Sequence, residues 1–280
     1  NPRAYFYSKA LDRQVVSAIG DLADYRRVLD IVLKYEIAYI FHVAAQSTVP
    51  TGFLNPLETF STNVMGTVNV LEAARQSPYI KGVVVASSDK AYGKDCADAK
   101  EDQKLAGEHP YDVSKSSADL IARAYFATYK LPVVISRFGN IFGPGDLNFN
   151  RIVPGIMDSV INGNVLQLRS DGSFIRDYVY VKDVTQGYRL LIENMEKIQG
   201  EAFNFSSHCV LSVIELIKKI ESVLGLECKY EILNNQRNEI PKQTLSTEKA
   251  QKMLGWKPYH SLEEGIRQTF KWYKDYFGQK

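Results

Sequence analysis

The chain is poor in cysteine, in long apolar runs and in excess charge of either sign. It has three cysteines, Cys96, Cys209 and Cys228, an odd number without the paired spacing of a metal site. No apolar stretch approaches the roughly 20 residues that cross a bilayer. The first residues, Asn-Pro-Arg-Ala-Tyr, lack the apolar core of a secretion signal. We therefore expect a cytoplasmic protein with no membrane span.

The charges of the chain almost cancel. Its 34 lysines and arginines face 32 aspartates and glutamates, for a net charge of +2. Because the basic residues are scattered, composition gives no electrostatic case for nucleic-acid binding. Hydrophobic residues at 45% and charged residues at 24% are typical of globular proteins. These values exclude a disordered, collagen-like or coiled-coil chain, and 280 residues are enough for two domains.

The first half of the chain alternates helix-like and strand-like segments. Apolar residues at helical spacing are followed each time by a short apolar run that is typical of a buried strand. The predicted helices cover 24–36, 57–71 and 114–129, and the predicted strands cover 38–45, 81–86 and 131–136. Parallel strands need such crossover helices, so the pattern predicts a doubly wound parallel sheet of the α/β class.

The second half loses this alternation. The predicted elements are a helix over 151–161, strands near 165–169 and 177–181, and two helices that begin with capping boxes, Ser212 with Glu215 and Ser261 with Glu264. This indicates a smaller mixed α/β domain packed against the first one across a cleft. We expect the first domain to comprise residues 1–141 and 176–205, and the second, substrate-binding domain to comprise residues 142–175 and 206–280.

Tyr111 and Lys115 are the strongest local signal for chemistry. Four residues apart on a helix, their side chains share a face, so the ammonium can favour the ionised phenol and make Tyr111 a usable base. They follow a predicted strand that ends at SSDK, 87–90, and ligands of doubly wound sheets bind beyond the carboxyl ends of strands. An isolated YxxxK, by contrast, favours a helix start that carries a surface lysine.

Together with further motifs, this pair resembles the extended short-chain dehydrogenases/reductases that act on nucleotide sugars. The motifs are, in order, GDL at 20–22, FHVAAQS at 41–47, TNVMGT at 62–67, RFGNIFGP at 137–144, RDYVYVKD at 176–183 and LGWKP at 254–258. They span essentially the whole chain. The resemblance implies a Rossmann-like first domain that binds NAD.

One feature of that family is missing. Its members open with a strand and a glycine-rich turn that holds the dinucleotide pyrophosphate, and no GxxGxxG occurs in the sequence. We expect a Rossmann-like domain that is N-terminally incomplete, because a doubly wound sheet without its central strand would expose two unpaired edges. The alternative is a chain that does not hold NAD as its relatives do.

Within the family, Ser88-Asp89-Lys90 resembles the acid and base pair of 4,6-dehydratases. An Asp-Lys pair is similar to that of CDP-glucose 4,6-dehydratases, whereas the motifs at Arg137 and Arg176 are more similar to the dTDP-glucose group. The resemblance implies a lyase of carbohydrate biosynthesis, a nucleotide-sugar 4,6-dehydratase that favours CDP-glucose over dTDP-glucose. Two alternatives remain open: a 4-epimerase in which Asp89 and Lys90 are structural, and a noncatalytic nucleotide-sugar binding protein.

The resemblance also implies roles for individual residues. Tyr111, with Ser88 and Lys115, would remove the O4 proton of the sugar while NAD takes the C4 hydride. Lys90, when neutral, would remove the C5 proton, and Asp89 would protonate the departing 6-hydroxyl. The implied cofactor contacts are Asp21, Leu22, Ala44, Ala45, Gln46, Tyr111 and Lys115, and the implied substrate contacts are Asn140 and Arg176.

Other residues carry weaker implications. Asn63 is expected to hold the active-site loops rather than to touch a ligand, and Arg237 is a minor candidate for a phosphate contact. His42 is expected to be a strand residue, and we predict no metal, because the four histidines lack metal-site spacing. The family resemblance further implies a homodimer that pairs through the helices at 57–71 and 114–129.

Overall fold

The computed structural model describes residues 4–94, 96–235 and 240–278. Its centre is a parallel four-stranded sheet in the order β1-β2-β3-β7. The strands are β1 (Tyr39–His42), β2 (Gly82–Ala86), β3 (Val133–Phe138) and β7 (Ala202–Phe205). Non-consecutive strands lie side by side here, so the chain must cross over the sheet between them.

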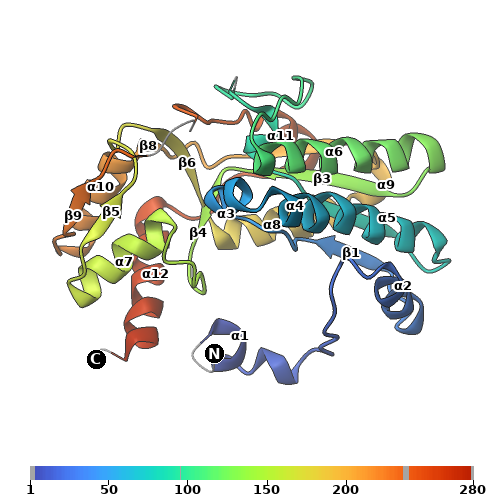
Figure 1. Cartoon of the computed structure of the whole chain (residues 1–280), viewed down its shortest axis with the longest axis horizontal. Helices are drawn as coiled ribbons and strands as arrows, with labels where there is room; N and C mark the ends of the chain where they lie inside the picture. Colours follow the sequence, from blue (N-terminus) through green and yellow to red (C-terminus); the bar gives the residue numbers. More distant parts are fainter. Residues whose placement is uncertain (1–3, 95, 236–239, 279–280) are drawn as a thin grey trace.

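Helices cover both faces of this sheet (Figure 1). One face carries α2 (Tyr25–Lys34), α5 (Gly66–Gln76) and α6 (Pro110–Tyr129), and the other carries α8 (Val181–Glu193), α9 (Met195–Ile198) and α11 (Glu248–Leu254). In β2, Val83 and Val85 pack toward α5 and α6, whereas Val84 packs toward α8. A strand covered on both faces reads as a continuous apolar run. The predicted doubly wound parallel sheet is confirmed.

The helical segment predicted over 57–71 has three consecutive parts. These are α4 (Pro56–Phe60), the π-helical turn η2 (Ser61–Met65) and α5, and they are preceded by α3 (Val49–Leu54). At the start of the chain, α1 (Tyr5–Ser8) and η1 (Leu11–Arg13) lie apart from the sheet, and α1 points toward the C-terminal helix (Figure 1). The ring of Tyr5 lies 6.5 Å from that of Trp272 in this helix.

A strand forms within the predicted range 38–45, but the prediction that it is buried is wrong. β1 covers only residues 39–42, and the exposed fractions of Tyr39, Phe41 and Val43 are 41%, 46% and 58%. Among the described residues β1 pairs with β2 alone, so it lies at the edge of the sheet. An apolar run has the same sequence pattern at an edge as in the centre, which is why the pattern did not reveal this exposure.

The second part of the molecule is smaller and mixed. β4 (Asn140–Phe142), β6 (Ile175–Tyr180) and β8 (Val210–Ser212) form one sheet, and β5 (Leu166–Leu168) pairs with β9 (Tyr230–Ile232). The helices α7 (Ile152–Asn162), α10 (Val213–Leu224) and α12 (Leu262–Phe277) enclose a separate core. Both predicted capping boxes form, at the starts of α10 and α12. The predicted mixed α/β region is confirmed.

The domain boundaries stay a prediction. β6 was assigned to the first domain, and it pairs with β4 and β8 of the smaller sheet. The next elements, α8 and β7, pack against or pair with the large sheet. The chain therefore passes between the two layers at the end of β6.

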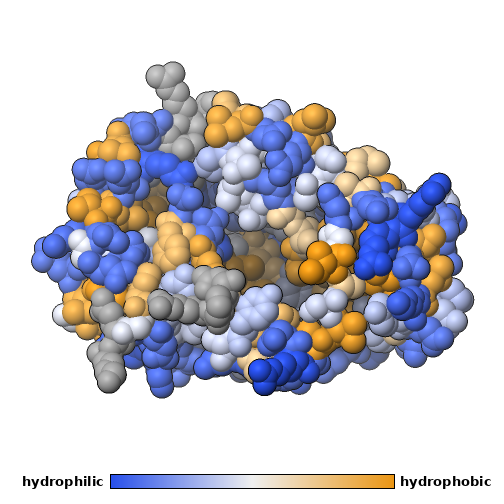
Figure 2. Space-filling model, turned by 60° about the horizontal axis from the view of Figure 1, so that its bottom comes forward, coloured by the Kyte–Doolittle hydropathy of each residue, from blue (hydrophilic) through white to orange (hydrophobic). Residues whose placement is uncertain are grey.

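Figure 2 shows the molecule turned by 60° from the view of Figure 1. Hydrophilic residues cover much of this face, and more hydrophobic ones line a hollow near its centre. None of the helices in the described ranges is both long and apolar enough to span a bilayer.

Candidate active site

The first two turns of α6 place Tyr111 and Lys115 at the carboxyl end of β2. Pro110 begins the helix, four residues before the predicted start, and proline fits the first helical position because its missing N–H would be unpaired there. Both side chains are buried, with exposed fractions of 8% and 7%. The Lys115 amine donates a hydrogen bond of 2.9 Å to the carbonyl of Ala86. This bond ties the helix to the strand end.

Burial is the largest influence on both of these groups. It raises the pKa of the Tyr111 phenol, the charge of Asp89 adds to this rise, and a hydrogen bond with Ser88 opposes it. Burial also lowers the pKa of Lys115 to about 8. From the sequence, we expect the Lys115 ammonium to favour the ionised form of the Tyr111 phenol. In the protein alone the phenol stays protonated at neutral pH, because removing it from water penalises the anion.

The short 3₁₀ helix η3 (Asp89–Tyr92) carries the other catalytic candidates. Ser88 caps this helix: its hydroxyl accepts a bond of 3.3 Å from the Lys90 N–H and donates one of 2.9 Å to Asp89 Oδ1. The Asp89 carboxyl is buried, and the Lys90 amine donates a bond of 3.0 Å to Gln243 Oε1. The structure therefore brings a hydroxyl, a carboxyl, a phenol and two amines together beyond the end of β2.

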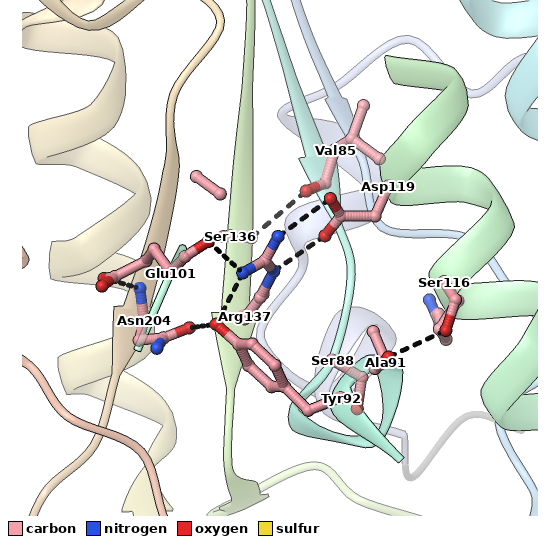
Figure 3. A network of polar contacts seen from close by, with 12 residues as sticks. Val85, Ser88, Ala91, Tyr92, Glu101, Ser116, Asp119, Ser136, Arg137 and Asn204 are labelled. Carbon is pink, nitrogen blue, oxygen red and sulfur yellow. Dashed lines mark hydrogen bonds and ion pairs between the residues drawn. The ribbon is translucent and has the colours of Figure 1, made fainter. Parts of the chain in front are cut away.

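A buried polar network connects η3 to α6 and to the strands β3 and β7 (Figure 3). Arg137 of β3 is fully buried and donates two bonds, of 2.8 and 2.9 Å, to the carboxylate of Asp119 on α6. The same guanidinium donates to the hydroxyl of Tyr92, the last residue of η3. Tyr92 in turn donates to Asn204 of β7 at 2.8 Å. One cation thus joins η3 to α6 and to the sheet.

Asn63 orders the loop that follows β1. Its side-chain oxygen accepts a bond of 2.7 Å from the Gln46 N–H, and its amide nitrogen donates to the Gln46 carbonyl at 3.0 Å. The same nitrogen donates to the hydroxyl of Ser114 on α6 at 2.9 Å. The expectation that Asn63 holds the active-site loops is confirmed.

The remaining cofactor candidates lie at two places along the fold. Ala44, Ala45 and Gln46 follow β1 directly. Asp21 and Leu22 precede α2, where the Asp21 carboxylate accepts from the N–H of Ala23 and the Leu22 carbonyl accepts a bond of 2.7 Å from Asn69. The side chain of Leu22 also lies against Gly66 at the start of α5. These contacts attach the 21–22 loop to the same helix layer as α6.

A cleft of about 890 Å³ contains both predicted substrate residues. Asn140 and Arg176 line it, and the Arg176 guanidinium lies over the ring of Phe174. Ser88 and Tyr111 are not part of its lining, but the site adjoins it. Arg151, another lining residue, exerts a positive charge that lowers the pKa of Tyr111. The sequence argument missed Arg151 and Arg169, because nothing in their local pattern separates them from surface arginines.

Two polar atoms without hydrogen-bond partners in the described part of the chain lie just after the strands β1 and β2, where a polar cofactor could pair with them. Gln46 Oε1 after β1 and Ser87 Oγ after β2 are buried and have no hydrogen-bond partner among the described residues. Buried polar atoms are normally satisfied, so both are available to a dinucleotide that lies across these strand ends. In the described residues no group of His, Cys, Asp and Glu side chains could hold a metal ion. Arg237 lies outside the described residues.

The comparison with protein families decides the assignment. The model of the GDP-mannose 4,6 dehydratase family matches residues 5–269. The chain belongs to this family. Among curated relatives, it is 30% identical over 275 residues to the CDP-glucose 4,6-dehydratase of Salmonella typhimurium, covering 92% of this chain and 76% of the relative. It is 27% identical to the human dTDP-D-glucose 4,6-dehydratase, covering 92% and 75%.

Other relatives of this dehydratase family are larger or catalyse other reactions. A trifunctional UDP-glucose 4,6-dehydratase of Arabidopsis thaliana is 30% identical over 91% of this chain, which spans about two fifths (39%) of its length. Among solved structures, the dTDP-glucose 4,6-dehydratase of Streptomyces venezuelae, with NAD bound, has a TM-score of 0.85 at 28% identity, covering 92% of this chain and 79% of that one. Similar folds also occur in nucleotide-sugar epimerases.

Two buried groups in this member of the dehydratase family were not assigned from the sequence. Gln243 contacts Lys90 across 153 positions of sequence, and Arg137 pairs with Asp119. Arg137 lies in a family motif, but no local pattern indicated its partner. His42 ends β1 as expected, and its ring bonds with the hydroxyl of Thr67 at 2.9 Å.

Proposed function

We propose that the chain is an NAD-dependent nucleotide-sugar 4,6-dehydratase that removes water from an NDP-hexose and yields the NDP-4-keto-6-deoxyhexose. The observation that supports this best is the placement of Asp89 and Lys90 directly beside Ser88, which bonds with Tyr111. A buried carboxyl and an amine next to an alcohol-oxidising pair supply the second acid and base that an elimination needs.

The first half of the reaction is assigned to Tyr111. Only the phenolate can take the proton of the sugar 4-hydroxyl, so Tyr111 must first lose its own proton. Burial raises the pKa of Tyr111, and the hydrogen bond with Ser88 opposes that rise. Lys115 orients the pair from the next turn of α6, where Ala86 fixes its amine. Residues 21–22 and 44–46, together with Tyr111 and Lys115, would hold NAD, which would supply the chemistry of accepting a hydride from C4 and returning one to C6.

The second half is assigned to Lys90 and Asp89. A 4-keto group acidifies the C5 hydrogen, and the neutral Lys90 amine takes it as a proton. The C5–H electron pair then forms the C5–C6 double bond while the C6–O bond breaks, and Asp89 gives its proton to the departing oxygen to form water. Lys90 finally returns its proton to C5 when C6 receives the hydride.

CDP-glucose is the proposed substrate ahead of dTDP-glucose. The Asp89-Lys90 pair resembles that of CDP-glucose 4,6-dehydratases, and one such enzyme is 30% identical to this chain. Arg176 and Asn140 are assigned to the diphosphate, because both line the cleft and a guanidinium can donate two bonds to phosphate oxygens.

Mass spectrometry after incubation with NAD and CDP-, dTDP-, GDP- or UDP-hexoses tests the proposal. We expect the loss of one water from one donor. Lys90→Met should abolish both this loss and the exchange of the C5 hydrogen with solvent. Lys94→Met is the matched control, because the one ion pair of this exposed lysine within the described residues is a solvated pair with Glu108. Dehydration and exchange that survive Lys90→Met would show the assignment to be wrong.

A 4-epimerase is the second candidate. The bond between Lys90 and Gln243 is also one that a purely structural lysine would make. An epimerase would convert the donor into an isomer of unchanged mass, and Lys90→Met would leave that conversion intact. The same mass spectrum therefore separates the two candidates.

We also propose that the active form is a homodimer. Phe53 and Leu54 at the end of α3 and Leu57 in α4 expose 63%, 86% and 80% of their surface, and Leu120 of α6 exposes 53%. These elements contact one another, and we assign the four exposed side chains to one apolar face. A second copy would remove this face from water.

A further inference from the structure

Gln243 reaches the catalytic residues from a distant part of the sequence. It lies between β9 and α11 and is fully buried. Its N–H donates a bond of 3.1 Å to the carbonyl of Ile175 at the start of β6. The next residue, Thr244, donates a bond of 2.7 Å to the carbonyl of Cys96. The backbone on both sides of the Gln243 amide is therefore fixed, and so is the place from which its side chain extends.

The amide of Gln243 is committed to Lys90. Its oxygen accepts the bond of 3.0 Å from the Lys90 amine, and a lysine amine in its charged form has only donors to offer. The amide nitrogen is buried and has no hydrogen-bond partner among the described residues. Leaving this buried N–H donor unpaired is unfavourable. The place of Gln243 is therefore not explained by hydrogen bonding of its own amide, whereas its bond to Lys90 does explain it.

Gln243 is also a neutral contact among charged side chains. Asp89 on η3 and Asp112 on α6 carry carboxyl groups near Lys90, and the positive charges of Arg176 on β6 and His109 before α6 act on the same cluster. Burial raises the pKa of Asp112, an effect that the Lys90 charge opposes. A third carboxylate at position 243 would hold Lys90 as an ammonium ion, whereas an amide oxygen holds the amine in either protonation state.

We propose that Gln243 is the positioning residue of Lys90. By accepting one N–H, the amide oxygen keeps the lone pair of the neutral amine away from itself, at one of the two other positions on nitrogen that are left to face the sugar. When Lys90 gains a proton the same bond becomes charge-assisted and strengthens, so Gln243 favours the proton transfer that the base must make. The inference rests on the proposed function, in which Lys90 takes the C5 proton.

Two substitutions with opposite electrostatic effects test this role. Gln243→Leu removes the acceptor, so kcat should fall about 10- to 100-fold with little change in KM, and C5 exchange should slow in parallel. The acid limb of the pH–kcat profile should move to lower pH, because the ammonium form loses its acceptor. Gln243→Glu keeps the acceptor but adds a charge, so the acid limb should move to higher pH.

Gln268→Leu is the matched control. Gln268 accepts a bond of 2.8 Å from Lys182 away from the active site, so its loss should leave kcat and the pH profile unchanged. If both Gln243 variants keep the wild-type profile and kcat, Gln243 does not position Lys90. If Gln243→Leu fails to fold, the Glu variant decides the question alone through the direction of its pH limb.

A second readout separates this inference from the proposed function. NMR of the Lys90 side-chain nitrogen gives its titration midpoint in the wild type and in both variants without any turnover. Midpoints displaced in opposite directions by Leu and Glu support the positioning role, even where no donor is dehydrated and the proposed function fails. The inference is overturned, and the proposed function is kept, if the wild type dehydrates its donor while the Lys90 midpoint is the same in the wild type and in both variants.

Discussion

His42 is a buried histidine whose ring is held in one tautomer by its neighbours. Thr67 donates its hydroxyl proton to the carbonyl of Asn63, so its oxygen must accept from His42 Nε2. Burial, helped by the charge of Lys115, lowers the pKa of His42 from its ordinary value of 6.5 to about 4. The ring is therefore neutral in the folded protein at neutral pH.

This histidine should make the protein sensitive to acid. Because the folded pKa is depressed, its contribution to stability is complete above pH 6.5 and is lost as the pH falls from 6.5 to 4. The loss amounts to about 3 kcal/mol of unfolding free energy. Urea unfolding across this range should show His42→Gln losing less stability on acidification than the wild type. Equal losses in both proteins would place the acid sensitivity elsewhere.

Single residues also show which properties of the active site the sequence can predict. The helical spacing of Tyr111 and Lys115 is a local property, and the structure places them on successive turns of α6. Their pKa values depend on burial, which no spacing reveals, and burial raises that of Tyr111. The role of Gln243 could not be predicted for a different reason: its contact with Lys90 joins residues 153 positions apart and exists only in the folded chain.

At the scale of elements, the Arg137–Asp119 pair connects β3 to α6. Both side chains are fully buried, so removing one partner leaves an unpaired buried charge. Asp119→Leu should lower the unfolding free energy by about 3–5 kcal/mol, and Arg137→Met combined with Asp119→Leu should cost much less than the sum of the two single changes. Urea denaturation of the four proteins measures both effects.

The same carboxylate offers a control. Arg123 also pairs with Asp119, at 3.1 Å, but its side chain is 39% exposed. Arg123→Ala should therefore cost less than about 1 kcal/mol. A large loss for Arg123→Ala with a small one for Asp119→Leu would contradict the assignment of η3 support to Arg137. Arg137 also holds Tyr92 of η3. The Asp119→Leu protein should therefore lose activity at urea concentrations at which it is still folded.

Elements differ in how well the sequence predicted them. β2 and β3 are buried on both faces, so their apolar runs gave them correctly. The helices α10 and α12 begin at capping boxes, which are local hydrogen-bonded motifs. β1 was predicted as a buried strand and is an exposed edge, because the place of a strand in its sheet is decided by partners distant in sequence.

At the scale of the whole molecule, the apolar face of α3, α4 and α6 leads to the last prediction. Leu54 and Leu57 are the most exposed of its side chains. If a second copy covers them, the protein should sediment at twice the 31.6 kDa of one chain. Leu57→Glu should then give a monomer, because burying a carboxylate without a partner is costly.

An exposed apolar residue elsewhere separates pairing from general solubility. Ile232 of β9 is 51% exposed in the smaller part of the molecule, so Ile232→Glu should leave the sedimentation of the dimer unchanged. A monomeric wild type, or a dimer that Leu57→Glu leaves intact, would refute the proposed face. α6 bears Tyr111 and Lys115 in its first two turns, so pairing through this helix would also hold these two side chains in place. The Leu57→Glu monomer should therefore dehydrate its substrate more slowly than the dimer.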